Sequence, residues 1–478
     1  MSRNGSGVYS LPAGNPVVAG TTISSSWANT TLSDIATALT GSVASDGQTV
    51  MTGNLQMGTN KITGLGAGTA STDAVNLGQI TGGTTAGVFT SVTDSGLTSG
   101  RVTYATTAGL LTDSANMTFS GTALTLANDA SISGLTVGKG GGSTTYPNTA
   151  YGYQALGGSN SGSGVNTAVG YQAMLGNTSG DSNAAFGWTA LTANTTGSTN
   201  AAFAMGSLVS NTTGSSNTAV GYQSLRSNTT TSGSTAVGYQ SLYSNTGGSY
   251  QVAVGWSALY SNTTGDANVA VGRSALYTNS TGSYNTALGY TALASNTTAS
   301  NNTAVGYQSL YSNTTATQNS GLGYRSGYSN TTGAYLTAIG YQAAFSNTTG
   351  DANTVLGTSA LYSNTTGGEN TAIGYAAAYS NVTGSPIVAI GAFALYSNTG
   401  SNNVSVGHAS MYSNTSGTDN VAMGVDTLRG NTTGQYNTAI GKQALRLNTT
   451  ASNNTAVGYQ ALYSNTTGGY TVGIGRQA

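Results

Sequence analysis

The ionisable side chains are the first place to look for chemistry in this sequence, and they are few. The 478 residues include 11 Lys and Arg and 12 Asp and Glu. Two carboxylates that cleave a glycosidic bond must stand about 5 to 9.5 Å apart, and Asp419 and Asp426 are the candidates for such a pair. The equivalent places elsewhere in the chain are substituted, which is typical of solvated surface groups. We therefore interpret the pair as chance and predict no catalytic residue.

Metal and thiol chemistry lack their usual residues. The sequence has no cysteine and a single histidine, His408, so it offers neither a thiolate set nor a histidine cluster. No phosphate-binding loop of the form GxxxxGKS or GxxxxGKT occurs. We predict no metal site and no cofactor, and a structural or surface role for His408. A net charge of −1 gives no long-range field that would attract nucleic acid or an anionic membrane.

A repeated block dominates the chain from residue 148 to residue 478. It reads approximately NTAVGYQALYSNTTGSY, and its core glycine returns every 17 residues, for instance at Gly221, Gly238 and Gly255. A disordered linker rich in Ser, Thr, Asn and Gly has no reason to return residues to fixed offsets, whereas a repeat architecture does. The period is too short for a helical-hairpin repeat of about 34 residues. A stack of short β coils is therefore expected.

Each block divides into a strand and a turn. Alternate side chains of an extended strand fall on opposite faces, which would place Val220 and Tyr222 on one face and Ala219 and Leu225 on the other. The Asn-Thr-Thr-Gly that follows is turn material, because Asn and Gly accept positive φ. The predicted fold class is all-β: a parallel β-roll or β-solenoid of about twenty coils, roughly 95 Å long at an inter-strand spacing of about 4.8 Å.

Stacked identical coils predict ladders of identical side chains. Asparagine amides can bond their copies above and below, and aromatic rings can stack. Tyrosine recurs at two positions of the block, directly after the core glycine, as at Tyr222 and Tyr239, and five residues after it, as at Tyr243 and Tyr260. The principal interpretation is structural; the alternative is that exposed tyrosines form a saccharide-binding surface. The ladder residues predicted here are Asn211, Asn228, Asn262, Asn313, Asn364, Asn431, Tyr243, Tyr260, Tyr277, Tyr311, Tyr362 and Tyr396.

The repeat carries more apolar stripes than one narrow coil can bury. A second apolar stripe repeated over about twenty coils would leave a long exposed patch on a monomer, which soluble monomers rarely tolerate. Association around the long axis would cover it. A parallel homotrimer is therefore expected. The pattern supports an oligomer more directly than it supports three copies.

The chain before the repeats divides into two further regions. Residues 1–83 contain a predicted helix over 29–40, in which Leu32, Ile35 and Leu39 line one face and Gly41 is placed to end it. Residues 84–147 resemble the β-rich shaft segments that often precede such repeats and are interpreted as a shaft or linker. The predicted organisation is thus an attachment region at 1–83, a linker at 84–147 and the repeat domain at 148–478.

Two N-terminal motifs carry a resemblance to a known family. Residues 54–65 read NLQMGTNKITGL and are followed by TDAVNL at 72–77; this resembles the GNLxMGxxxIxxL and PTDAV pattern near the base of many bacteriophage tail fibres. Residues 2–39 are similar to the virion-proximal start of such fibres. The repeats resemble, in coil architecture only, the head β-rolls of trimeric autotransporter adhesins.

The resemblance implies a structural fibre of a virion tail that is not an enzyme. Its N-terminus would join phage tail or baseplate proteins, and its shaft would reach a bacterial surface glycan or protein receptor. No export signal is recognised in residues 1–20, which favours this location over secretion. The alternatives are a non-viral surface adhesin or extracellular filament, and a capsule depolymerase tailspike. Because the last repeat stops part-way, Ala478 is a candidate cleavage boundary where a C-terminal chaperone would be removed.

Overall fold

The structure, a computed structural model, describes seven strands between residues 81 and 138 and then residues 148–158 and 164–478. By internal contacts the chain separates into two units, 1–98 and 99–478. Most of the predicted attachment region, including the expected helix over 29–40, lies outside the described residues. In the part of the chain that is described, no helix is long and apolar enough to cross a membrane.

Short antiparallel pairs precede the repeats. β1 pairs with β2, β4 lies between β3 and β5, and β6 forms a hairpin with β7. β7 then pairs antiparallel with β8, the first strand of the repeat domain. The bounds are β1 Thr81–Gly82, β2 Phe89–Ser91, β3 Arg101–Ala105, β4 Leu111–Phe119, β5 Leu124–Leu126, β6 Ala130–Ile132 and β7 Leu135–Gly138.

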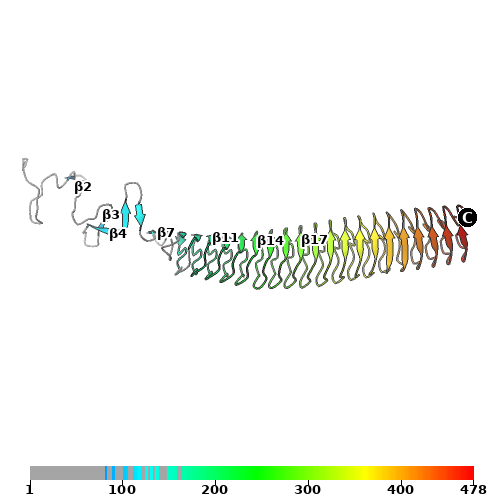
Figure 1. The fold of residues 1–478 in the computed structure, drawn as a ribbon, viewed down its shortest axis with the longest axis horizontal. Coiled ribbons are helices and arrows are strands. Elements are labelled where there is room, and N and C mark those ends of the chain that lie inside the picture. The colour runs from blue at the N-terminus through cyan, green and yellow to red at the C-terminus, as the bar shows by residue number, and fades with distance from the viewer. Residues whose placement is uncertain are drawn as a thin grey trace, which may run out of the picture. The chain divides into compact units, whose positions relative to one another are not determined.

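Twenty parallel strands, β8 to β27, form a β-solenoid of about 19 turns spaced about 17 residues apart, and Figure 1 shows them standing in one row along the solenoid. This confirms the predicted fold class. Neighbouring strands pair in register, so that Ala219 lies opposite Ala236. The bounds are β8 Thr149–Tyr153, β9 Thr167–Val169, β10 Ala184–Phe186, β11 Ala201–Phe203, β12 Thr218–Val220, β13 Thr235–Val237, β14 Val252–Val254, β15 Val269–Val271, β16 Thr286–Leu288, β17 Thr303–Val305, β18 Ser320–Leu322, β19 Thr337–Ile339, β20 Thr354–Leu356, β21 Thr371–Ile373, β22 Ile387–Ile390, β23 Asn403–Val406, β24 Val421–Met423, β25 Thr438–Ile440, β26 Thr455–Val457 and β27 Val472–Ile474.

The strand of each coil is shorter than the alternating pattern indicates. β12 ends at Val220, because Gly221 follows with φ of 134° and turns the chain. A Cβ on Gly221 would stand 2.3 Å from the carbonyl oxygen of Gly238 in the next coil, so only glycine fits without a shift. The expectation that Val220 and Tyr222 share one strand face is therefore wrong: Val220 ends the strand, and Tyr222 already belongs to the turn.

The turns use left-handed backbone at residues that rarely adopt it. In the coil of β12, Gln223 and Leu225 have φ of 53° and 50°, and the corresponding residues repeat this in most other coils. Hydrogen bonds to the next coil hold these residues in place, such as Leu225 N–H to Ser241 C=O at 3.0 Å. The stacked coils therefore fix a conformation that a lone coil would not favour.

The interior of the solenoid is narrow and half polar. Ala219, Leu225 and Asn228 of one coil are all fully buried, and the same kinds of residue line most of the other coils. Buried alanines at mid-strand and buried leucines within the turns form one continuous apolar cluster along the repeat domain. Asparagine supplies most of the buried polar residues, and its amides must therefore be satisfied inside the protein.

Candidate functional site

In seventeen successive coils the asparagine seven residues after the core-glycine position belongs to a continuous ladder that we call the turn ladder. In each case the Nδ2 group donates to the Oδ1 atom of the copy one coil earlier, at 2.6 to 3.4 Å, and sixteen such bonds follow one another without a break. All six asparagines named from the sequence lie in it. Its members are Asn177, Asn194, Asn211, Asn228, Asn245, Asn262, Asn279, Asn296, Asn313, Asn330, Asn347, Asn364, Asn381, Asn398, Asn414, Asn431 and Asn448.

From Asn194 to Asn448, each amide of the turn ladder uses both of its protons. Asn211 Nδ2 donates to Asn194 Oδ1 at 2.9 Å and to the carbonyl of Gly214, in its own turn, at 2.9 Å. The ladder therefore ties each turn to itself and to its neighbour at once. Because these side chains are buried and engaged, the Asn-Thr-Thr triplets of the turn ladder are turn elements, as expected from the sequence, and not accessible acceptors for glycosylation.

A second asparagine ladder, which we call the strand ladder, was not predicted. Its members directly precede the strands, as Asn183 and Asn200 do, and the Oδ1 of Asn183 accepts the backbone N–H of Asn200 at 2.8 Å. Asn183 Nδ2 donates to the Gly197 carbonyl at 2.9 Å, the same oxygen that Asn194 reaches from the turn ladder. The sequence signal was the first letter of the NTAVG block, which recurs with the same period.

Two aromatic ladders run along the outside of the turn region. The first aromatic ladder follows the core glycine and includes Tyr290, Tyr307 and Tyr324, whose successive ring centroids are 5.2 Å apart. The second lies five residues after the glycine and includes Tyr243 and Tyr260, 5.1 Å apart with planes 9° from parallel. All six predicted tyrosines lie in the second ladder, where most rings stack on a neighbour: Tyr243, Tyr260, Tyr277, Tyr311, Tyr328, Phe345, Tyr362, Tyr379, Tyr396 and Tyr412.

Stacking changes what these tyrosines can bind. Inside a ladder both faces of a ring are covered by its neighbours, so a sugar cannot lie flat on them and only ring edges and hydroxyls meet the solvent. Burial raises the pKa of Tyr260 above its ordinary value of 10.0, and Tyr243, Tyr277 and Tyr239 raise it further because their phenolates would repel its own. The pKa of Tyr396 is raised for the same reasons.

Every arginine of the described repeats lies over a ladder ring. Arg226 covers Tyr243 at the start of one aromatic run, and Arg429 covers Tyr412 at the end of another, at 5.4 and 5.5 Å from the ring centroids. Arg325 lies between the two ladders, over Tyr324 and Tyr328. Arg226 and Arg429 thus cover the ring faces that stacking leaves open at the ends of the runs, and Arg325 reaches rings that are already stacked on both sides. The remaining cases are Arg273, Arg446 and Arg476.

The residue before each core glycine forms an apolar row on the outer face of the strands, which we call the strand ridge. None of its members is buried, and Leu288, Leu322 and Leu356 are 45 to 48% exposed. No outward position of β8 to β27 carries a charge. The ridge comprises Tyr151, Val169, Phe186, Phe203, Val220, Val237, Val254, Val271, Leu288, Val305, Leu322, Ile339, Leu356, Ile373, Ile390, Val406, Met423, Ile440, Val457 and Ile474.

No protein-family model matches the chain, and neither the curated proteins nor the solved structures contain a significant match. The arrangement of the described residues is therefore the only guide to function beyond the sequence motifs.

The candidate carboxylates have separate partners. Asp426 forms an ion pair with Arg429 at 3.5 Å, and Asp419 accepts a hydrogen bond from Asn402 Nδ2 at 3.1 Å. Within the described residues, no three His, Cys, Asp or Glu side chains come close enough together to hold a metal ion. His408 packs edge-on to the ring of Phe393 at 6.0 Å.

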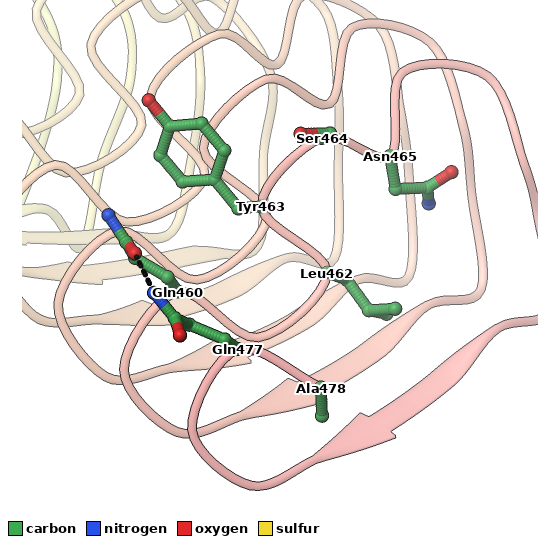
Figure 2. A pocket seen from close by; sticks show the side chains of 7 residues that line it. All are labelled: Gln460, Leu462, Tyr463, Ser464, Asn465, Gln477 and Ala478. Carbon is green, nitrogen blue, oxygen red and sulfur yellow. Dashed lines mark hydrogen bonds between the residues drawn. The ribbon is translucent and has the colours of Figure 1, made fainter.

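The last coil shows the interior in cross-section. Figure 2 shows Leu462 between Ala478 and the more distant Asn465, with the dashed bond from Gln477 Nε2 to Gln460 Oε1 at 3.1 Å. Leu462 N–H donates to the Ala478 carbonyl at 2.8 Å. These residues line an open hollow together with Tyr463 and Ser464. Cleavage after Ala478 stays a prediction.

Proposed function

We propose that this chain is the shaft-forming fibre protein of a bacteriophage tail and that it mediates adhesion to the host bacterial surface. The observation that carries the proposal is the unbroken solenoid, in which each coil is bonded to the next through backbone, asparagine and aromatic ladders. Such a rod supplies reach and stiffness. The motifs at 54–65 and 72–77 support attachment of the N-terminal region to tail or baseplate proteins.

We propose further that three copies pack through the strand ridge. Twenty coils at about 4.8 Å, and two outward residues about 7 Å apart along each strand, give a flat face of at least roughly 650 Å². That approaches the roughly 800 Å² that each partner contributes to a stable interface. The ridge residues are apolar and the face is uncharged, so a second copy is the partner that this face complements.

Adhesion in this proposal depends on repetition. A surface feature that recurs once per coil can make many weak contacts with a repetitive receptor, and linked weak contacts add up to high avidity. The turn side of the coil, which carries the aromatic ladders, stays accessible when the strand side packs against sister chains.

Two experiments test the proposal. Gold-labelled antibodies against the purified chain should mark fibres on phage tails in lysates of the source bacterium; labelling of the cell surface without particles would contradict a virion role, and release of reducing ends from capsule would indicate a depolymerase. Light scattering should give the full-length chain the mass of three copies of 47.3 kDa.

A matched pair of variants locates the interface. Replacing Val237, Val254 and Val271 by lysine should reduce the species to single chains, because six like charges would be buried for every two ridges in contact. Lysine at Thr230, Thr264 and Thr281, which are exposed in the turns, should leave the mass unchanged. A trimer that survives the ridge substitutions would exclude the strand ridge as its interface.

A further inference from the structure

In the first aromatic ladder a non-aromatic residue lies between two aromatic neighbours at four positions, Met205, Arg273, Thr358 and Ala392. The long side chain of Met205 occupies its own gap, and Phe393 contacts both Tyr375 and His408 around Ala392. The other two gaps are those at Arg273 and Thr358.

In the first of these two gaps, Arg273 lies between Trp256 and Tyr290, with its guanidinium carbon 4.9 Å and 5.8 Å from the two ring centroids. The chain therefore fills this gap with a cation of its own. A planar cation between two ring faces gains from both of their quadrupoles.

The second gap is open. Thr358 takes the position of Arg273 between Tyr341 and Tyr375, and its short side chain is exposed. Tyr341 and Tyr375 are 50% and 55% exposed, compared with 38% for Tyr324, which has a stacked ring on each side. The additional exposure indicates that one face of each ring is uncovered.

The outer sides of both rings are already packed. Tyr341 stacks on Tyr324 with centroids 5.0 Å apart and planes 8° from parallel. Tyr375 contacts Phe393 of the following coil edge-to-face at 5.2 Å. The uncovered sides of the two tyrosines are therefore those that meet the coil of Thr358. Ser359 and Ala376 are small residues at the position where several other coils carry glutamine, which leaves room beside the gap.

Spacing decides what fits there. Two coils separate the rings by about 10 Å, so a group at the midpoint lies about 5 Å from each centroid, within the roughly 6 Å range of a cation–π contact. Carbon atoms touch at about 3.5 to 4.0 Å, so the occupant must be about 3 Å thick between its outermost atoms. A tetrahedral trimethylammonium group has this thickness, whereas a flat sugar ring would touch only one tyrosine.

We propose that Tyr341 and Tyr375 bind a quaternary ammonium group, such as the head group of choline, by sandwiching it over Thr358. The site goes beyond the proposed fibre function and does not depend on it. A quaternary ammonium needs no hydrogen-bond acceptor, and the two ring faces supply the attraction that Trp256 and Tyr290 give to Arg273.

The second aromatic ladder contains a gap of the same size that is closed. Ala294 stands between Tyr277 and Tyr311, but it is only 8% exposed and both tyrosines are half-buried. The neighbouring side chains therefore cover that gap. A missing ring alone does not make a site; the exposure of Thr358 and of both flanking tyrosines distinguishes the one proposed.

Equilibrium dialysis of the full-length chain against radiolabelled choline tests the proposal. We expect saturable binding in the millimolar range with one site per chain. Thr358→Arg should abolish it, because the new guanidinium would fill the gap as Arg273 does. Arg273→Thr should raise the number of sites from one to two. Thr358 and Arg273 are both exposed, and circular dichroism of both variants confirms that the coils are intact.

Competition identifies the chemistry. The neutral isostere 3,3-dimethylbutan-1-ol should displace choline at least about fivefold less well, because it lacks the charge that both rings attract. Equal displacement by the isostere, or displacement by N-acetylglucosamine at the same concentration, would refute a cation site. Absence of saturable binding, or binding that survives Thr358→Arg, would refute the location.

Discussion

A carboxylate in place of one turn-ladder amide tests whether these asparagines are as tightly coupled as their geometry indicates. Asn296 Nδ2 donates to Asn279 Oδ1 at 2.7 Å and to the Ala299 carbonyl at 3.0 Å, and its Oδ1 accepts from Asn313 Nδ2 at 3.1 Å. In Asn296→Asp, an ionised oxygen replaces Nδ2 and faces two acceptors. Burial and this repulsion both raise the pKa of the new carboxyl in the folded protein.

The size of the effect depends on pH. Keeping the acid protonated at pH 7, about three units above the unfolded value of about 3.9, costs roughly 4 kcal/mol. The protonated acid still has one donor fewer than the amide, which costs about 1 kcal/mol more. Because the folded pKa is raised, the ionisation cost is absent below about pH 3.9 and develops as pH rises toward the folded pKa. We expect a loss of up to about 5 kcal/mol at pH 7 and about 1 kcal/mol at pH 3.

Hydrogen exchange measured by mass spectrometry over residues 289–312 reports the opening of this coil directly. Thr298→Asp is the control, because Thr298 is exposed in the same turn and its carboxylate stays hydrated. Protection should fall steeply for Asn296→Asp between pH 4 and pH 7 relative to the control. Equal protection of the two variants at pH 7, or a loss that does not change with pH, would refute the coupling.

Two further predictions concern the backbone and the aromatic ladders. Ala204 holds a core-glycine position with φ of 112°, so Ala204→Gly should stabilise the repeat domain by about 1 kcal/mol, measured as a higher unfolding temperature; Gly221→Ala, with the reverse change one coil on, should lower it, and an unchanged value for both would contradict the strain argument. Because the pKa of Tyr260 is raised in the folded chain, the stability that its neutral phenol contributes is intact below pH 10 and is lost as pH rises through the folded pKa. Phenolate absorbance should therefore show tyrosines titrating above pH 10 until unfolding, and uniform titration near 10 would argue against the stacked ladder.

The fold class followed from the sequence because period and glycine position report the same geometry. A residue that returns every 17 positions occupies the same place in each coil, and such a fixed period is typical of stacked repeats. The turn at Gly221 was not predicted, because the alternating pattern was continued through it to Tyr222. The turn conformation itself was beyond reach: Leu225 adopts φ of 50°, which an isolated leucine avoids, and only bonds to the next coil impose it.

The candidate site was only partly predictable for a related reason. Residue types identified the tyrosine positions, but the capping of ring faces by Arg226 and Arg429 depends on side-chain reach across coils. The strand ladder was readable in principle, since its asparagines recur with the period. It was missed because asparagine before a strand is ordinarily turn chemistry, and nothing in one coil reveals that its amide bonds the backbone of the next.

The two asparagine ladders differ in how strictly the chain keeps them, and the bonds explain why. In the strand ladder, Leu336 and Ile387 replace asparagine, yet the N–H of Leu336 still donates to Asn319 Oδ1 at 2.8 Å. A missing amide there removes an acceptor for one backbone N–H of the next coil. In the turn ladder each amide both donates to one neighbour and accepts from the other, so a missing member would leave a buried acceptor on one side and a buried donor on the other, each costing about 1 to 3 kcal/mol. The chain has asparagine at that position in every coil from Asn177 to Asn448. This is expected, because replacing one of these asparagines would leave an unpaired buried group in each of the two neighbouring coils.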